Sequence, residues 1–248
     1  MPHRRVHEPI GVFVFRLGLG LSIIAGGGCR DSTKNASSPS APGDVGDKMD
    51  SPISGEVPET PMDTARLLRR LRTTGRLAQL RPYLTPEHCE AILDLILAVD
   101  QLTIAAAELQ SAVGDTIGEA TADLYDFTSV ANSLELFSRD VELVDEQVRG
   151  EEASVVIQVA SRVPLNTVRF NRINGRWILQ TDAPRAGLPE GVLELAAALR
   201  RCAVEQRRNR WTIERFNKEL DRRTQDPRTM LRQLKSQAGS GDENSAPR

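Results

Sequence analysis

The segment TVRFNRINGRWILQ, residues 167–180, decides the fold because it contains two short apolar runs separated by Asn174-Gly175. An Asn-Gly pair readily adopts the positive φ angles of a two-residue type I′ turn. The residues on either side alternate in the manner of a half-buried strand. The segment therefore predicts an antiparallel hairpin.

Pairing across this turn gives the hairpin one apolar side. Arg172 lies opposite Trp177 in this register. Phe170 lies opposite Leu179, and Val168 points to the same face. That face must be covered, and the helices predicted before the hairpin are the available cover.

A second hairpin is predicted upstream of the first. After Asp140 the apolar residues change to a period of two, which is typical of strands. The turn is Arg149-Gly150-Glu151, and the strand positions are Val141, Leu143, Ala153, Val155, Ile157 and Val159. Together the hairpins predict a curved antiparallel sheet of about four strands.

Helices are predicted before this sheet. Thr60-Pro61 presents a capping hydroxyl followed by a proline at the first helical position, and Thr85-Pro86 repeats that signal. The helix after Thr85 has an apolar stripe with steps of three and four residues, and Gly114 and Gly118 indicate a break in it. Helical character is expected to persist to about Leu136. The stripe comprises Ile92, Leu95, Val99, Leu102, Ala106, Leu109 and Val113.

Helices are also predicted after the sheet. One begins at Leu188-Pro189, breaks near residues 209–211 and restarts from Thr212. A last short helix is expected to open at Asp226-Pro227. The fold class is therefore α+β: N-terminal helices packed on an antiparallel sheet, followed by C-terminal helices.

The order of capped helices and paired hairpins, ending in Ile173-Asn174-Gly175-Arg176-Trp177-Ile178, resembles the nuclear-transport-factor-two-like family. The likeness would cover about residues 61–182. It implies a cone-shaped α+β domain. This sequence departs from the family order by having no strand pair before Thr85-Pro86 and by adding helices after residue 188. The family's isomerase branch implies a carboxylate base and tyrosine donors, but no motif here marks them.

The N-terminus has the pattern of an export signal. Arg4, Arg5 and Arg16 precede an apolar run over residues 17–25, and Gly26-Gly27-Gly28 leads to Cys29. This arrangement resembles a bacterial lipoprotein signal, which implies lipid attachment at Cys29. Gly26 departs from the usual leucine three residues before the cysteine.

Two alternatives to lipidation stay open. The chain could be cleaved after the glycines without receiving lipid, or residues 10–28 could remain as an uncleaved anchor that carries the costly Arg16. We expect an exported protein, lipid-anchored to a bacterial membrane and facing away from the cytoplasm.

Composition divides the rest of the chain. Residues 30–60 are rich in Ser, Pro, Gly and Asp, have no aromatic residue and are predicted to form a disordered tether. The expected organisation is a signal over 1–29, this tether, an α+β core over 61–187, a helical extension over 188–237 and a disordered tail over 238–248.

Cysteines and histidines limit the chemistry. With Cys29 assigned to lipid, Cys89 and Cys202 could form a disulfide in an oxidising compartment or remain two separate buried thiols. His88 alone would remain in the mature chain, in the first turn of a helix, so neither a metal site nor another cofactor is expected.

Familiar catalytic motifs are absent from the sequence. The acidic and phenolic groups nearest the helical stripe could line a pocket with one raised pKa, although solvated faces are the simpler interpretation. They are Asp94, Asp100, Asp115, Asp123, Asp126 and Tyr125. A pocket enzyme of isomerase or hydrolase type is therefore the alternative hypothesis.

The C-terminal region is basic, with 12 Lys/Arg against 5 Asp/Glu over residues 200–235. Such helices could contact anionic lipid or an acidic envelope protein, or they could be solvated and paired with neighbouring acids. Nucleic acid is not expected as a partner outside the cytoplasm, and the aromatic content of 4% leaves few large side chains on which bases or sugars could stack. The candidate cations are Arg207, Arg208, Arg210, Arg215, Lys218, Arg222 and Arg223.

The leading hypothesis is thus a non-enzymatic binding or scaffolding module of the cell envelope. The sequence combines a predicted export and lipid-attachment signal, a tether and a sheet with one apolar face that helices can cover. It contains no recognisable catalytic group of residues. Its oligomeric state leaves no trace in the sequence.

Overall fold

The computed structural model describes residues 58–125, 128–161 and 165–239. In these residues four strands form an open antiparallel sheet in the order β1-β2-β3-β4, with helices before and after it, so the predicted α+β class is confirmed. The strands are β1 (Val141–Arg149), β2 (Glu152–Val159), β3 (Asn166–Ile173) and β4 (Arg176–Gln180). The helices, with η marking 3-10 turns, are α1 (Pro61–Thr73), η1 (Leu77–Tyr83), α2 (Cys89–Thr116), α3 (Glu119–Ala122), η2 (Asp123–Tyr125), α4 (Thr128–Ala131), η3 (Glu135–Phe137), α5 (Leu188–Asn209) and α6 (Ile213–Gly239).

The β3–β4 hairpin has the predicted register. Phe170 pairs with Leu179, and Arg172 pairs with Trp177. Asn174, at the turn, has a φ of 51°, as a type I′ turn requires. The Arg172 guanidinium lies 5.7 Å from the centre of the Trp177 ring, which gives the pair a cation–π contact.

One face of the sheet packs against α1, η1 and the first two turns of α2. We call this set of buried residues the sheet cluster. Its centre is fully buried, with Leu68, Leu80, Val155, Ile157 and Phe170 each 0% exposed. The alternating residues of β2 therefore fill the space between strands and helices with side chains.

The start of α1 is fixed to this sheet. The Thr60 hydroxyl accepts a hydrogen bond from the Asp63 amide, which confirms the predicted helix cap. The Met62 amide donates to Oε2 of Glu146 on β1 at 2.9 Å. A carboxylate is well placed there because the first amides of a helix carry partial positive charge.

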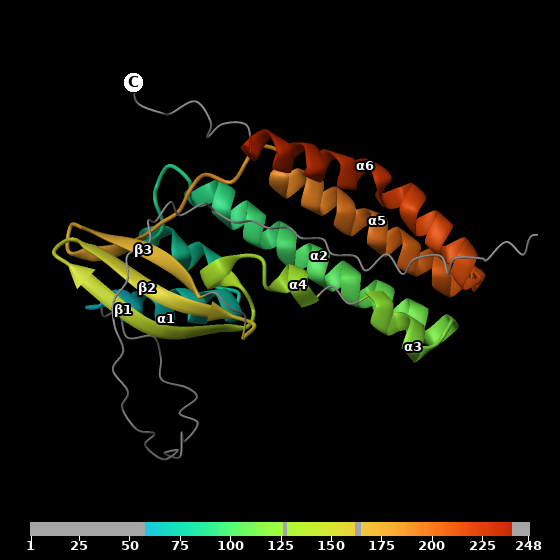
Figure 1. Ribbon diagram of the computed structural model, residues 1–248, viewed down its shortest axis with the longest axis horizontal. Helices are drawn as coiled ribbons and strands as arrows, with labels where there is room; N and C mark the ends of the chain where they lie inside the picture. Colours follow the sequence, from blue (N-terminus) through green and yellow to red (C-terminus); the bar gives the residue numbers. More distant parts are fainter. Residues whose placement is uncertain (1–57, 126–127, 162–164, 240–248) are drawn as a thin grey trace, which may run out of the picture.

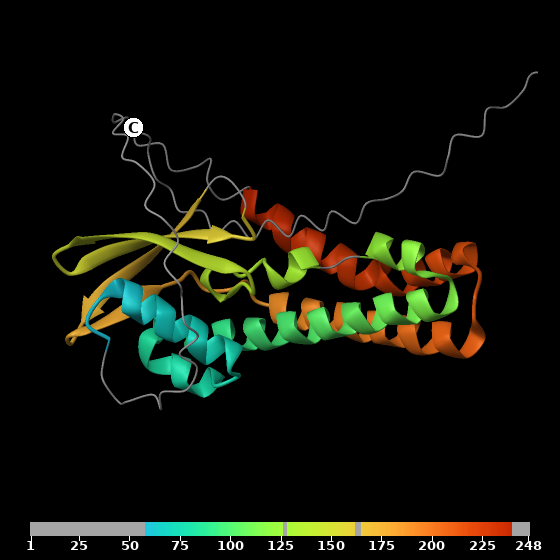
Figure 2. The ribbon, with the colours of Figure 1, turned by 90° about the horizontal axis from the view of Figure 1, so that it is seen from below.

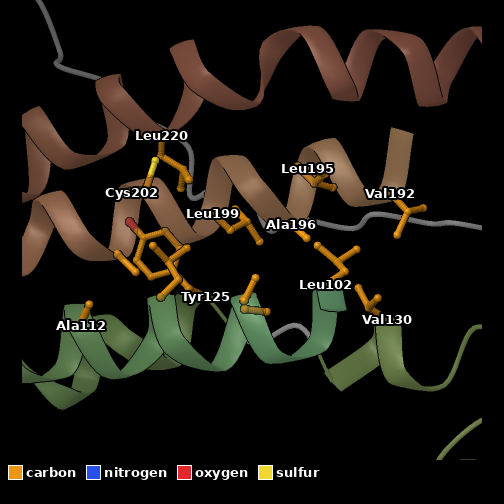
Figure 3. Packing of buried hydrophobic residues seen from close by; sticks show 14 of the residues in the cluster. Leu102, Ala112, Tyr125, Val130, Val192, Leu195, Ala196, Leu199, Cys202 and Leu220 are labelled. Carbon is orange, nitrogen blue, oxygen red and sulfur yellow. The ribbon is translucent and has the colours of Figure 1, made fainter. Parts of the chain in front are cut away.

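Helix α2 continues beyond the sheet and forms a second core with α5 and α6, which we call the helical cluster. We call the part of the molecule built around the sheet cluster the sheet lobe and the part built around the helical cluster the helical lobe. Figure 1 shows α2 connecting the two lobes, with α5 and α6 beside its far end. Figure 3 shows Leu102 and Ala112 of α2 facing Leu195, Leu199 and their neighbours on α5.

Helices α2 and α5 run in the same direction. On α5, Arg200 lies near Gln101 and Glu108 of α2. One heptad further on, Arg207 lies near Ser111 and Asp115. Residue numbers therefore increase in the same direction along both helices. Helix α6 then returns antiparallel to α5 after the turn at residues 210–212. A parallel helix pair needs a long connection, and here the sheet lies within it.

The predicted break at the glycines falls at Gly118, whose φ is 136°. Helix α2 ends at Thr116, and the chain turns back so that α3 packs against α2. A Cβ on Gly114 would stand 3.6 Å from Cβ of Ala122, which marks the close approach of the two segments. Helical character then continues only as short pieces to Phe137.

Two predicted helix starts are wrong. Thr85 does not cap α2: its hydroxyl donates instead to the Leu179 carbonyl of β4, and α2 begins four residues later at Cys89. Asp226-Pro227 does not open a separate helix, because α6 is continuous through Pro227. The buried residues Leu220 and Leu231 on either side of the proline belong to one cluster, so packing holds the helix together.

Candidate functional site

A shallow groove of about 410 Å³ lies between the end of η1 and the β3–β4 hairpin. Its floor is apolar, since Leu84 and Ile178 are 1% and 8% exposed. Leu84 also forms a parallel bridge with Leu179, so residues 82–86 partly cover the edge of β4. The residues that line it are Arg81, Pro82, Leu84, Pro86, Ile173, Asn174, Arg176 and Ile178.

Two arginines stand at the rim of the groove. Arg81 forms an ion pair with Glu90, with Nε 2.8 Å from Oε1, and this pair raises the pKa of Arg81. Arg176 is exposed and has no ion-pair partner among the described residues. The groove therefore offers an apolar floor beside an available cation, which suits a ligand carrying a carboxylate next to an apolar group.

The structure separates the acidic and phenolic residues predicted from the helical stripe. Asp100 binds Arg72 of α1, while Asp115 lies 3.9 Å from Arg207 of α5. Asp94 and Asp123 are exposed, and Asp126 lies outside the described residues. They do not meet around one cavity, and two of them link helices.

Tyr125 is part of the helical cluster. Its hydroxyl donates a short hydrogen bond to Oδ1 of Asn217, and its ring meets Phe216 edge-on with centroids 5.3 Å apart. Burial, together with the nearby Asp221 carboxylate, raises the pKa of Tyr125 to about 12. The phenol is therefore neutral at physiological pH and joins α6 to the segment after α3.

Cys89 and Cys202 are free thiols and are buried in different clusters. Cys89 begins α2 in the sheet cluster, whereas Cys202 lies in the helical cluster, level with residues 101–108 of α2. Along a helix that separation is roughly 20–25 Å, far beyond the Cα distance that a disulfide spans. Burial raises the pKa of both thiols, to about 11 for Cys202.

His88 is half-buried and immediately precedes α2. Its carbonyl accepts from the Ile92 amide, and its side chain makes no capping hydrogen bond. In the described part of the chain, no three His, Cys, Asp or Glu side chains are grouped as metal ligands would be.

Most of the basic residues make contacts within the chain. Arg223 binds Glu205 at 2.7 Å and Glu219 at 3.4 Å, and Arg222 binds Glu219 at 2.8 Å. Arg215 stacks over Trp211 at 5.5 Å. Arg208, Arg210 and Lys218 have no such partner among the residues described. The basic region is thus largely a set of local pairs, which matches the solvated interpretation.

Glu135 is an ionisable group that the sequence did not single out. It has a φ of 46°, and burial, reinforced by the charge of Asp182, raises the pKa of its carboxyl to about 7. Its neighbour Leu134 packs against both clusters. Glu135 therefore lies where the two lobes join, and its sequence context, a lone Glu between apolar residues, gives no hint of this.

Cys29, the predicted export signal and residues 30–57 of the predicted tether lie outside the described residues. Among the residues that are described, no helix combines the length and apolarity required to span a bilayer. Neither a protein-family model, nor a curated protein sequence, nor a solved structure matches the chain. The resemblance of residues 61–182 to the nuclear-transport-factor-two-like family stays a prediction.

Proposed function

We propose that this protein is an envelope lipoprotein, attached to the membrane through Cys29, that acts as a non-enzymatic binding or scaffolding module. The observation that carries this proposal is that the groups a pocket enzyme would use are engaged in contacts between helices. Asp100, Asp115 and Tyr125 each contact another helix, and the inner face of the sheet is filled by side chains.

The groove beside β4 is the binding surface of the proposed module. Its apolar floor and the exposed Arg176 suit a peptide segment of another envelope protein in which an acidic residue adjoins an apolar one. Ile173, 47% exposed, stands at the same rim and enlarges the apolar contact.

The anchor is tested by mass spectrometry of the mature N-terminus and by fractionation. Wild-type protein should carry a diacylglyceryl group on Cys29 and sediment with membranes, while Cys29→Ser should be exported but lose the membrane fraction. An unmodified N-terminus on membrane-free wild-type protein would reject the lipid anchor.

Binding is tested by pull-down from detergent-solubilised membranes with a groove variant, Ile173→Asp with Arg176→Glu. The matched control is Val148→Asp with Arg149→Glu, which changes the same residue types at the exposed β1–β2 hairpin. The proposal expects envelope proteins retained by wild type and control to be lost from the groove variant. Equal retention by all three proteins, or none by any, would contradict it.

A further inference from the structure

Within the part of the chain that the structure describes, no element covers the outer face of the α2–α5 pair, and apolar residues are exposed on it. Leu97 and Ile104 on α2 are 49% and 48% exposed, and Leu193 and Val204 on α5 are 44% and 63% exposed. Figure 2 shows α6, α3 and α4 on the other side of these two helices. We call this surface the outer face.

These four side chains form two ridges along the helices. Leu97 and Ile104 are seven residues apart, and Leu193 and Val204 are eleven apart, spacings that keep each pair on one side of its helix. Large exposed apolar residues grouped on one surface mark an interaction site more often than scattered ones do.

The charges between the ridges differ in sign from one helix to the other. Helix α2 has five acidic residues and no Lys or Arg, whereas residues 199–209 of α5 have four Arg and one Glu. Glu108 and Arg200 lie 3.5 Å apart, and Asp115 and Arg207 lie 3.9 Å apart. All four side chains are 37–65% exposed, so each can take a further partner.

This arrangement is complementary to itself. Because α2 and α5 are parallel, a two-fold axis running along them sets α2 of one copy against α5 of the other, again parallel and at the same level. Leu97 then meets Leu193, and Glu108 meets Arg200. An axis across the helices would instead set α2 against α2 and bring like charges together, at an energetic cost.

We infer that the outer face is a homodimer interface, in which the acidic α2 of each copy docks against the basic half of α5 of the other. The occupant of the outer face is thus a second copy of this chain. The groove beside β4 lies in the other lobe and stays free, so the dimer would present two grooves.

The test uses the full exported chain with Cys29→Ser, so that lipid does not cause association. Its mass is measured by light scattering and sedimentation equilibrium over a range of concentrations. At high concentration the measured mass should be twice that of one chain. The double variant Leu97→Asp with Ile104→Asp should have the mass of a single chain. Leu124→Asp, which removes a residue that is 54% exposed but lies outside the outer face, should remain dimeric.

A charge exchange separates loss of docking from loss of folding. Variant A carries Arg200→Glu and Arg207→Glu, and variant B carries Glu108→Arg and Asp115→Arg. Each should be folded by circular dichroism yet monomeric alone, because positions 108 and 115 of α2 and positions 200 and 207 of α5 then carry charges of the same sign. An equimolar mixture of A and B should recover the doubled mass. A wild-type chain that stays monomeric throughout, or A and B that dimerise alone, would overturn the inference.

Discussion

The guanidinium of Arg72 in α1 binds the carboxylate of Asp100 in α2 through two hydrogen bonds, one of them 2.8 Å from Nη1 to Oδ2. Asp100 follows Ile96, the last α2 residue of the sheet cluster, and lies within the part of α2 that builds the helical cluster. The pair therefore holds the first helix to α2 where the two lobes overlap.

Breaking this pair should lower stability. The Arg72 side chain is only 18% exposed, so Asp100→Asn leaves a largely buried cation without its counter-charge, at a cost of about 1–3 kcal/mol. Chemical denaturation measures the change. Asp94→Asn, at an exposed position of the same helix, should stay within about 0.5 kcal/mol of wild type; equal effects at both positions would mean that the pair contributes nothing specific.

The raised pKa of Glu135 makes stability depend on pH. In the folded protein its carboxyl has a pKa of about 7, above its ordinary value of 4.5, so the folded state binds the proton more tightly than the unfolded state does. Stability should therefore fall as pH rises from 4.5 through 7. Glu135→Gln should raise the unfolding free energy at pH 8 by about 1–2 kcal/mol, allowing for solvent screening, and change it little near pH 4.5.

Melts of wild type and Glu135→Gln across this pH range measure the effect. Glu142→Gln, at an exposed position on β1, is the control and should follow wild type at every pH. A Glu135→Gln curve parallel to wild type would show that this carboxyl does not titrate between those limits.

Gly114 and Gly118 should respond oppositely to alanine. Gly118 has a φ of 136°, so Gly118→Ala should cost about 1–3 kcal/mol although nothing lies within 4 Å of the added Cβ. Gly114 is inside α2, and its added Cβ would make an ordinary contact with Ala122. Gly114→Ala should stabilise the protein by up to about 1 kcal/mol. Thermal denaturation measures the change in stability of each variant. A change of the same sign in both variants would contradict a helix break at Gly118.

Two unpaired thiols should be found in the folded chain. Cys89 and Cys202 are 6% and 0% exposed, and raised pKa values keep them as thiols. Alkylation followed by mass spectrometry should label them slowly in native buffer and completely in denaturant, Cys202 last. Labelling of neither residue in denaturant without reductant would indicate that they are oxidised.

The sheet and its register could be predicted because their determinants are local. Asn174-Gly175 fixes one turn, and the alternation from Ala153 to Val159 fixes the buried face of β2. The pairing of α2 with α5 could not be predicted, because an amphipathic stripe indicates which side of a helix is buried but not which element packs against it. Thr85 and Pro227 show the same limit: local capping and breaking signals gave way to a contact with Leu179 and to packing around Leu220 and Leu231.

The candidate site was less predictable than the fold. Arg176 and Ile173 lie near Pro82 and Pro86 only because β4 runs beside η1, and no spacing in the sequence encodes that meeting. The same holds for Glu135, whose pKa is raised by burial and by the charge of Asp182, a residue distant from it in the sequence.

The parallel pairing of α2 and α5 has a consequence for how the chain reaches this structure. Residues 117–187 separate the two helices in the sequence, so α2 is synthesised with its apolar stripe unpaired until α5 follows the sheet. Contacts of such high sequence separation form late, and the waiting intermediate is prone to aggregate. The helical lobe should therefore be the last part of the protein to gain protection from hydrogen exchange.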